Sequence, residues 1–374
     1  MQTVLQLLDP AVTAEEICLA LWLKQRLEPL GVRVHSAALG NRGDYPDTIF
    51  ETLDAKLLPF RMGIPLTAVG PIRQLVRTHG AETLFCWGYQ ALTAGALVRP
   101  GLGKLRLALG AVRPPPKSRQ MRWFRSLGSD INVVAAGNTV AQAFIRSGVA
   151  ADNVRIIRPA VDFGRLRAAR ELKVRQQLGL GEFKHVLISV GPLDRPHGQV
   201  NSLWAMTILQ QVYPDVALIF SGKGYRHDRI QRFVADLNLV SRVRFAHGRW
   251  ALPELLLAAD VAIFPVVQEV STLPLTWAMG AGVPIVATVN RGNCELIEDN
   301  HSAMLVRAKD PRGIAQRCHM LFNDDALRWK VTDNARHEAY KYLSVQRMLD
   351  EFTDFFRQRE QPEKLVPLPV LGEG

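Results

Sequence analysis

One short stretch of the chain places a carboxylate beside the expected start of a helix. Glu269 lies in a polar loop that follows an apolar run, 260–265, and a helix is expected after it, capped by the hydroxyl of Thr272 and with Pro274 in its first turn. The first amides of a helix lack intrahelical partners and attract anions. Because the apolar run has the composition of a buried parallel strand, these amides are expected at the carboxyl edge of a sheet. The stretch therefore predicts a site for the phosphates and sugar of a nucleotide-sugar.

The densest group of cations is the segment 113–125, RPPPKSRQMRWFR. Trp123 and Phe124 lie among the cations, and no acidic residue follows before Asp130. Such a segment can rest on anionic lipid headgroups, where each cation contributes roughly 1 kcal/mol, or grip a phosphorylated acceptor. A solvated helix face with the aromatic pair packed inward explains the same pattern. The cations are Arg113, Lys117, Arg119, Arg122 and Arg125.

The composition limits the classes of protein to which the chain can belong. It has 374 residues, 48% of them hydrophobic and 22% charged, which fits two globular domains better than one. The formal charge of +11 favours anionic partners such as phosphorylated donors or anionic lipid. Nucleic acid is not an expected partner, because no recognised binding motif accompanies the charge.

Location and metal binding are predicted from what the chain lacks. No apolar run reaches the roughly 18 residues of a transmembrane helix, and the start MQTVLQLLDP lacks the basic residues of a signal peptide. The four cysteines are scattered without a CxxC pair, so we expect reduced thiols and no metal site. We therefore expect a cytoplasmic protein. Peripheral contact with the cytoplasmic face of a membrane, through 113–125, is an alternative that stays open.

Strands and helices alternate along both halves of the chain. Such alternation predicts an α/β fold with two doubly wound Rossmann-like domains that face each other across a cleft, where the ligand binds. Thr13 and Glu16 have the spacing of a capping box at the first helix, and 40–60 is loop-like. The expected strands are 3–8, 32–35, 83–87, 104–110, 131–135 and 154–157, then 185–190, 216–221, 243–246, 260–265, 284–288 and 303–306.

Several segments of the second half follow one another in a set order: ISVGPLDRPHG (188–198), LIFSGKG (218–224), RVRFAHG (242–248), ADVAIFP (259–265), AMGAGVPIVAT (278–288) and RGNCELIEDN (291–300). In this order and spacing they resemble the GT-B glycosyltransferases of the group 1, or family 4, class. The resemblance is specific over 153–356 and looser before it. It implies an acceptor-side domain at 1–163, a donor domain at 164–344, a helix at 345–360 that crosses back to the first domain, and a flexible tail at 361–374.

The resemblance assigns roles to individual residues. Glu269 matches the first glutamate of the family's pair, beside the donor sugar, and Trp277 stands where the second glutamate holds the nucleotide ribose. Each further assignment has a structural alternative, such as a surface position for Arg195, a tight turn for Gly222 and a first-turn helix acid for Glu295. Donor contacts are implied for Gly191, Arg195, His197, Gly222, Lys223, Ser271, Thr272, Leu273 and Glu295.

The sequence departs from the family pattern at the site itself. Trp277 offers one N–H donor and no carboxylate, and Pro192 and His197 occupy the positions of two family cations. No glycine lies between Glu269 and Gly280, where the family has several. Two hypotheses follow. One is a retaining, metal-independent glycosyltransferase for polysaccharide biosynthesis, which moves a hexose-type sugar from a nucleoside-diphosphate-sugar to a glycan or lipid-linked acceptor. The other is a catalytically impaired GT-B protein that binds a nucleotide, a glycan or a partner enzyme.

Overall fold

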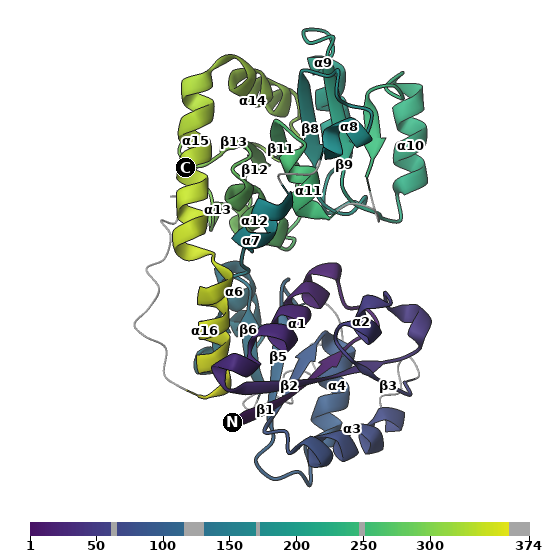
Figure 1. Ribbon diagram of the computed structural model, residues 1–374, viewed down its shortest axis with the longest axis vertical. Helices are drawn as coiled ribbons and strands as arrows, with labels where there is room; N and C mark the ends of the chain where they lie inside the picture. Colours follow the sequence, from purple (N-terminus) through teal and green to yellow (C-terminus); the bar gives the residue numbers. More distant parts are fainter. Residues whose placement is uncertain (61–65, 116–130, 170–172, 247–250, 359–374) are drawn as a thin grey trace. The chain divides into compact units, whose positions relative to one another are not determined.

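The computed structural model describes residues 1–60, 66–115, 131–169, 173–246 and 251–358. Within these ranges the chain forms two compact units: residues 1–159 with 346–358 make unit 1, and residues 160–345 make unit 2. Each unit contains one parallel sheet with helices packed on it (Figure 1). The prediction of an α/β fold with two doubly wound units is confirmed.

Unit 1 is built on a seven-stranded sheet in the order β3-β2-β1-β4-β5-β6-β7. The chain starts with β1, adds strands on one side and then returns to add the others, so the loops after β1 and β4 meet at a switch point. The strands are β1 (Gln2–Leu8), β2 (Val32–Leu39), β3 (Lys56–Leu58), β4 (Thr83–Trp87), β5 (Arg106–Ala111), β6 (Ile131–Ala135) and β7 (Val154–Ile156), and the α-helices are α1 (Ala14–Arg26), α2 (Thr48–Glu51), α3 (Leu66–His79), α4 (Tyr89–Val98), α6 (Asn138–Arg146) and α16 (Val345–Phe356).

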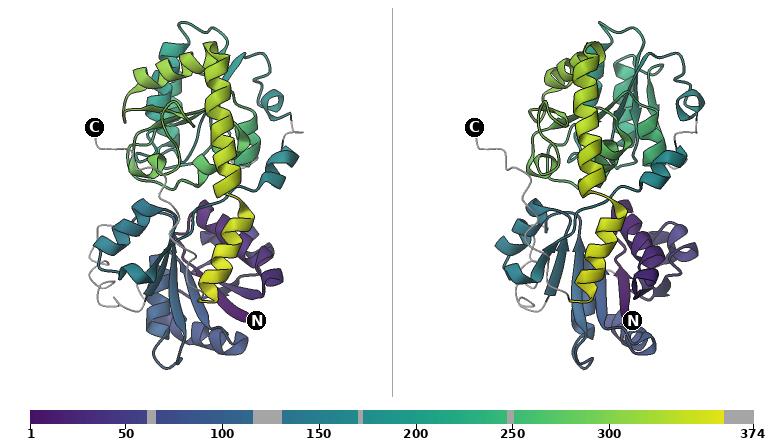
Figure 2. Two further views of the ribbon diagram at one scale, coloured as in Figure 1. Left: turned by 90° about the vertical axis from the view of Figure 1, so that its left-hand side faces the viewer. Right: turned by 60° about the vertical axis from the view of Figure 1, so that its left-hand side comes forward.

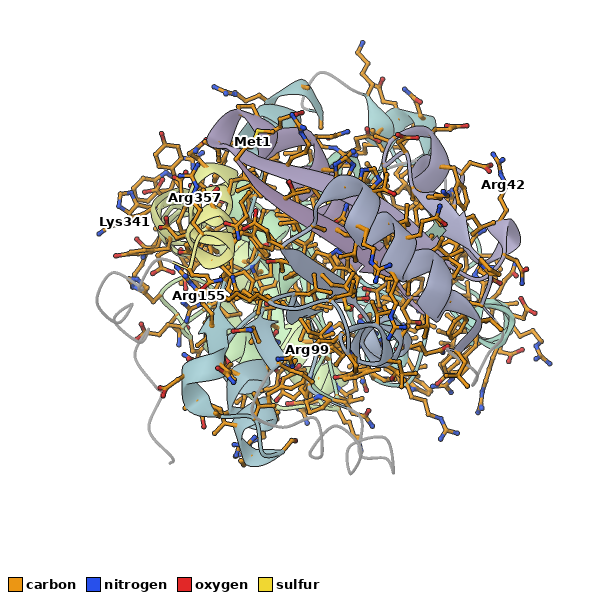
Figure 3. The ribbon with its side chains drawn as sticks, turned by 90° about the horizontal axis from the view of Figure 1, so that it is seen from below. Met1, Arg42, Arg99, Arg155, Lys341 and Arg357 are labelled. Atoms are coloured by element: carbon orange, nitrogen blue, oxygen red, sulfur yellow. The ribbon has the colours of Figure 1, made fainter. Side chains whose placement is uncertain are left out.

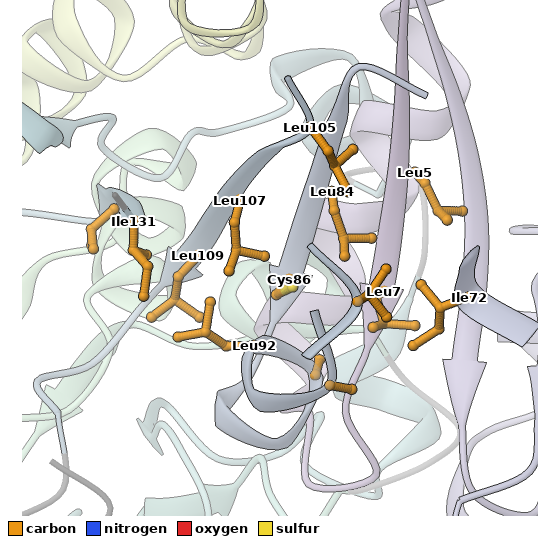
Figure 4. Packing of buried hydrophobic residues seen from close by; sticks show 14 of the residues in the cluster. Leu5, Leu7, Ile72, Leu84, Cys86, Leu92, Leu105, Leu107, Leu109 and Ile131 are labelled. Atoms are coloured by element: carbon orange, nitrogen blue, oxygen red, sulfur yellow. The ribbon is translucent and has the colours of Figure 1, made fainter. Parts of the chain in front are cut away.

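Both faces of the sheet of unit 1 are covered by other elements. Successive side chains of β4 point to opposite faces and show what covers each one. Leu84 and Cys86 pack with residues of β1, β5, α3 and α4 in one cluster (Figure 4). Phe85 faces the other side, where the centre of its ring lies 5.5 Å from that of Phe356 in α16. Both views of Figure 2 show α16 lying along unit 1. The last described helix therefore completes the core of unit 1.

The labelled cations of unit 1 are spread over its surface rather than gathered at one place. Arg42, Arg99 and Arg357 lie at well-separated positions in Figure 3. Arg106 serves the fold, because its guanidinium donates to the carbonyl oxygen of Phe355 at 3.1 Å and so fastens the end of α16 to β5. Part of the positive charge of the chain is therefore structural.

Unit 2 repeats the design with a six-stranded sheet in the order β10-β9-β8-β11-β12-β13. The strands are β8 (His185–Ser189), β9 (Val216–Phe220), β10 (Val243–Phe245), β11 (Val261–Phe264), β12 (Ile285–Thr288) and β13 (Met304–Val306). The helices are α7 (Phe163–Ala169), α8 (Val174–Gln177), α9 (Val200–Leu209), α10 (His227–Asp236), α11 (Leu252–Leu257), α12 (Leu273–Ala281), α13 (Arg291–Cys294), α14 (Pro311–Asn323) and α15 (Asp325–Tyr342).

Local sequence signals are confirmed where they depend on neighbouring residues. At the start of α1 the backbone N–H of Glu16 donates to the Thr13 hydroxyl at 3.3 Å, and the Glu16 carboxylate accepts the N–H of Thr13 at 2.7 Å. The expectation of a loop over 40–60 is wrong, because α2 and β3 lie there. Elements of three or four residues are too short to show a periodic apolar pattern.

Candidate active site

The switch point of unit 2 lies between β8 and β11, which are hydrogen-bonded neighbours in the sheet. Because β9 pairs with β8 on its other side, the loops after all three strands begin at one edge of the sheet. The fold thereby gathers residues that the sequence assigned to donor binding: Gly191, Arg195 and His197 after β8, Gly222 and Lys223 after β9, and Glu269, Ser271, Thr272 and Leu273 after β11.

Glu269 is held by the backbone of a distant segment. One carboxylate oxygen accepts the N–H of Arg291 at 3.2 Å, and the other accepts the N–H of Gly292 at 3.1 Å. Both donors belong to α13, whose start is capped by the side chain of Asn290. A carboxylate oxygen has two lone pairs, so each can accept a further hydrogen bond. Glu269 is thus fixed in position while part of its accepting capacity stays open.

The start of α12 differs from the prediction in one respect. Thr272 is the N-cap residue, but its backbone is helical and its hydroxyl makes no capping hydrogen bond. The hydroxyl of Ser271 accepts the N–H of Leu273 instead, at 3.2 Å. A capping hydroxyl requires an extended backbone at the N-cap, which Thr272 lacks. Pro274 lies in the first turn, as predicted, and α12 ends at Gly282 in the left-handed conformation.

The three loops pack backbone against backbone through glycines. A Cβ atom at Gly222 would lie 2.4 Å from the carbonyl oxygen of Gly191, and one at Gly198 would lie 2.0 Å from that of Pro265. No side chain fits at such distances, so glycine is required at both positions. The close packing of the loops explains why the segment LIFSGKG (218–224) has glycine at position 222. Contact of Gly222 and Lys223 with a nucleotide base stays a prediction.

His197 and Arg195 occupy different surroundings. The imidazole of His197 lies on Gly191, since a Cβ atom there would be 2.6 Å from the ring, and its Nδ1 lies 2.8 Å from a carboxylate oxygen of Asp194. This carboxylate offsets any positive charge that the ring carries. The side chain of Arg195 is exposed, while its backbone N–H donates to the Tyr225 hydroxyl at 3.3 Å. Arg195 is therefore the more available cation of the two.

Trp277 lies inside α12, and Glu295 lies at the end of α13. Trp277 is 4% exposed in α12 and packs in the core of unit 2, so its contact with a ribose stays a prediction. Glu295 follows the last residue of α13 as its C-cap. The expectation of a first-turn helix acid is therefore wrong, because the helix in this segment precedes Glu295 instead of following it.

Unit 1 has a polar pocket at the corresponding edge, after β1, β4 and β5. Its volume is about 180 Å³, and its lining includes Asp9, Glu16, Gln90 and Arg113. Asp9 is 2% exposed, and one carboxylate oxygen accepts the backbone N–H groups of Gln90 at 2.6 Å and Ala91 at 3.4 Å. The loop after β1 thus caps α4 with a carboxylate.

Burial controls the charge of this pocket. It raises the pKa of Asp9 and of Glu16, and the backbone donors and the nearby Arg113 oppose the rise. The Oε1 atom of Gln90 is buried and has no hydrogen-bond partner among the residues that the structure describes. The pocket therefore combines an exposed guanidinium with an acceptor that a ligand hydroxyl can satisfy.

Most of the basic segment lies outside the described residues. Arg113 is described, whereas Lys117, Arg119, Arg122 and Trp123 fall in 116–130. Over the described ranges no helix is long and apolar enough to cross a membrane, and no three His, Cys, Asp or Glu side chains form a group suited to a metal ion. The predictions about membrane contact therefore stay open.

Three residues with clear roles at these edges were not predicted from the sequence. Asp9 caps a helix that is 81 residues away, and Asp194 orients the ring of His197. Gln199 is fully buried and donates to the carbonyl oxygens of Val190 and Gly191, both at 3.0 Å. The Asp-x-x-His spacing of 194–197 was the one local signal that could have indicated a contact.

The second half of the chain matches a known family. Residues 171–338 match the family model described as glycosyl transferases group 1. These residues form a group 1 glycosyltransferase domain. The putative glycosyltransferase EpsD of Bacillus subtilis is 26% identical over 184 residues, covering 49% of this chain and 48% of that protein. The lipopolysaccharide glucosyltransferase WaaG of Escherichia coli is 26% identical over 166 residues, 44% of each chain. The chain thus matches about half the length of these curated relatives.

Solved structures extend the likeness to both units of the chain. Anabaena HepE in complex with UDP-glucose has a TM-score of 0.82 and 19% identity, covering 96% of this chain and 100% of that one. The structure of WaaG, a glycosyltransferase involved in lipopolysaccharide biosynthesis, has a TM-score of 0.72 and 17% identity, covering 95% and 99%. At this level of identity the likeness concerns the fold, which is GT-B.

Proposed function

We propose that the chain transfers a sugar from a nucleoside-diphosphate-sugar to a glycan or lipid-linked acceptor, with retention of configuration and without a bound metal. The observation that carries the proposal is the pairing of Glu269 with the start of α12. Glu269 is anchored by two amides of α13, and the start of α12 is capped by the neutral hydroxyl of Ser271 and not by a carboxylate. A carboxylate for sugar hydroxyls thus lies beside a helix start that attracts phosphate.

The charge balance of the reaction supports this assignment. When the bond from the sugar to the nucleoside diphosphate breaks, negative charge develops on the leaving phosphate. The N–H of Leu275 in the first turn of α12 and the exposed cation of Arg195 can stabilise that charge without a metal ion. UDP and UDP-glucose are bound in the HepE structures, which makes a UDP-sugar the first donor to test.

Unit 1 is the proposed side for the acceptor. Its pocket presents the guanidinium of Arg113 and the unpartnered Oε1 of Gln90, which suit an acceptor that carries a hydroxyl next to an anionic group. A lipid-linked glycan with a phosphate has this chemistry. The segment 113–125 begins at the same pocket, and we propose that it adds cations for a phosphate or a membrane surface.

The test is a comparison of donor binding and turnover in the full chain. UDP-glucose and other UDP-, GDP- and ADP-sugars are first compared by thermal shift, because a ligand that binds the folded state raises its stability. The donor that stabilises most is then assayed for sugar release with and without acceptor. Turnover that is lost in Glu269→Ala supports the proposal. Binding by the unaltered chain without any sugar release would support the impaired alternative, and no binding of any nucleotide-sugar would contradict the proposal.

A further inference from the structure

A groove that is larger than the pocket of unit 1 lies in unit 2, at the edge of the sheet opposite to the candidate active site. Its volume is about 1050 Å³. Its lining includes Lys184, Asp260 and Pro284, which directly precede β8, β11 and β12, and several residues of α15. Figure 1 labels these strands and α15. In a parallel sheet the first residues of the strands lie one strand length from their carboxyl ends, where the candidate site is. That length is about 15 Å for strands of four or five residues.

An exposed aromatic ring dominates the α15 side of the groove. Trp329 is 70% exposed, although it borders a groove rather than a convex surface. Thr332 follows one helical turn later on the same face of α15. Its hydroxyl oxygen is buried and has no hydrogen-bond partner in the described parts of the chain. The groove thus offers a flat apolar surface next to a polar atom that lacks a partner.

The positive and negative charges of the groove lining cancel. Lys184, Arg328 and Arg336 are positive, and Asp260, Asp325 and Asp333 are negative, so the sum is zero. Burial lowers the pKa of His185, which favours its neutral form near neutral pH.

Most of these charges are already paired. Arg328 lies 2.7 Å from Asp325, Arg336 lies 3.1 Å from Asp333, and Asp260 is held by Arg175 at 3.2 Å. An ionic ligand gains little from such a lining, whereas the paired side chains still offer spare donors and acceptors to hydroxyl groups.

We propose that this groove binds an uncharged oligosaccharide without acting on it. A sugar ring has an apolar face, which stacks on the indole of Trp329, and a rim of hydroxyls, which reach the ion pairs of α15. Bound there, a glycan chain is held by unit 2 at a distance from the site where sugar would be transferred. The proposal does not depend on the proposed function, because glycan binding is measured without a donor.

The experiment is calorimetric titration of the full chain with maltohexaose, cellohexaose, xylohexaose and the hexamer of N-acetylglucosamine. We expect at least one to bind, and Trp329→Ala to weaken that binding by about tenfold or more. Trp329→Phe keeps a stacking surface and should lose less than Trp329→Ala. Trp204→Ala is the matched control, because Trp204 is 44% exposed on α9, outside the groove, and should leave binding unchanged.

Three results would overturn the proposal. The first is the absence of binding of all four oligosaccharides up to about 5 mM, beyond the affinity at which a site is useful. The second is binding that Trp329→Ala leaves unchanged while a thermal melt shows that the variant is folded. The third is tighter, salt-sensitive binding of an oligogalacturonate than of the neutral sugars, which would mean that the groove selects charge.

Discussion

The two units differ in how they use a carboxylate at the carboxyl edge of the sheet. In each unit a helix begins at the carboxyl edge of the sheet, next to the switch point: α4 after β4, and α12 after β11. In unit 1 the buried carboxylate of Asp9 accepts the first amides of α4. In unit 2 the carboxylate of Glu269 turns to α13, and Thr272 does not cap α12 with its side chain.

This difference indicates where a phosphate can bind. At α4 the carboxylate of Asp9 already supplies the negative charge that a helix start attracts, so a phosphate in this pocket must bind to Arg113 and not to the helix start. At α12 the carboxylate lies to one side and only the neutral hydroxyl of Ser271 accepts an amide of the helix start, so no negative charge opposes a phosphate there. We call the carboxyl edge of the unit 1 sheet, where Asp9 accepts the amides of α4, the closed edge. We call the carboxyl edge of the unit 2 sheet, at the start of α12, the open edge.

The largest effect is expected from Glu269→Ala. Loss of the carboxylate frees the amides of Arg291 and Gly292 and removes an acceptor for donor hydroxyls. We expect kcat/KM for sugar release to fall by about 100-fold, which corresponds to roughly 2.7 kcal/mol of transition-state stabilisation. Gln268→Ala, at the exposed neighbouring position, should stay within about twofold of the unaltered chain. Equal rates for both variants would show that Glu269 does not contribute to sugar release.

Asp9→Ala should act on stability and leave donor binding intact. The substitution leaves the buried amides of Gln90 and Ala91 without an acceptor, at a cost of about 2–3 kcal/mol. Hydrogen exchange of α4 amides is the direct measurement, because it reports the free energy of opening in unit 1 alone. We expect faster exchange throughout α4 and an unchanged affinity for the nucleotide-sugar. Unchanged exchange at α4 would show that Asp9 does not close this edge.

Gly222→Ala should disturb the open edge through its backbone. The added Cβ would lie 2.4 Å from the carbonyl oxygen of Gly191, so the loops after β8 and β9 must separate. We expect a loss of about 1–2 kcal/mol of stability and weaker nucleotide binding in calorimetry. Gly181→Ala is the control, since its Cβ would meet the nearest atom, in Gln176, at an ordinary 3.6 Å. Identical behaviour of the two variants would contradict the backbone packing of these loops.

The smallest effect is a dependence of stability on pH at the closed edge. Burial raises the pKa of Asp9 above its ordinary value of 3.8. The stability linked to this group is therefore full below the ordinary value and is lost as the pH rises through the raised one. We expect the stability advantage of the unaltered chain over Asp9→Asn to shrink as the pH rises from about 4 to about 7, measured by urea unfolding. An advantage that grows over this range would mean that the hydrogen bonds outweigh burial.

The sequence predicted those parts of the fold and site that depend on local or periodic patterns. The strands at Thr83–Trp87 and Ile131–Ala135 lie where the apolar runs placed them, and the capping box at Thr13 is confirmed. The loops after β8, β9 and β11 were placed together correctly because parallel strands bring their carboxyl ends to one edge.

The contacts that distinguish the two edges could not be predicted in this way. The Asp9 cap joins residues 81 apart, and the hydrogen bond from Gly292 to Glu269 joins residues 23 apart. No spacing rule connects such pairs. The Thr272 cap was predicted from residue type, and it fails because the backbone at this position is helical. Side-chain chemistry alone does not determine that backbone conformation.

Hydrogen–deuterium exchange of the full chain with and without saturating UDP tests the difference between the two edges most directly. GDP and ADP, measured in the same way, cover the other bases. We predict slower exchange at 191–198, 269–276 and 290–293 in unit 2, and no change at 88–92 in unit 1. Protection at 88–92, with none at 269–276, would contradict the assignment of the open edge to unit 2.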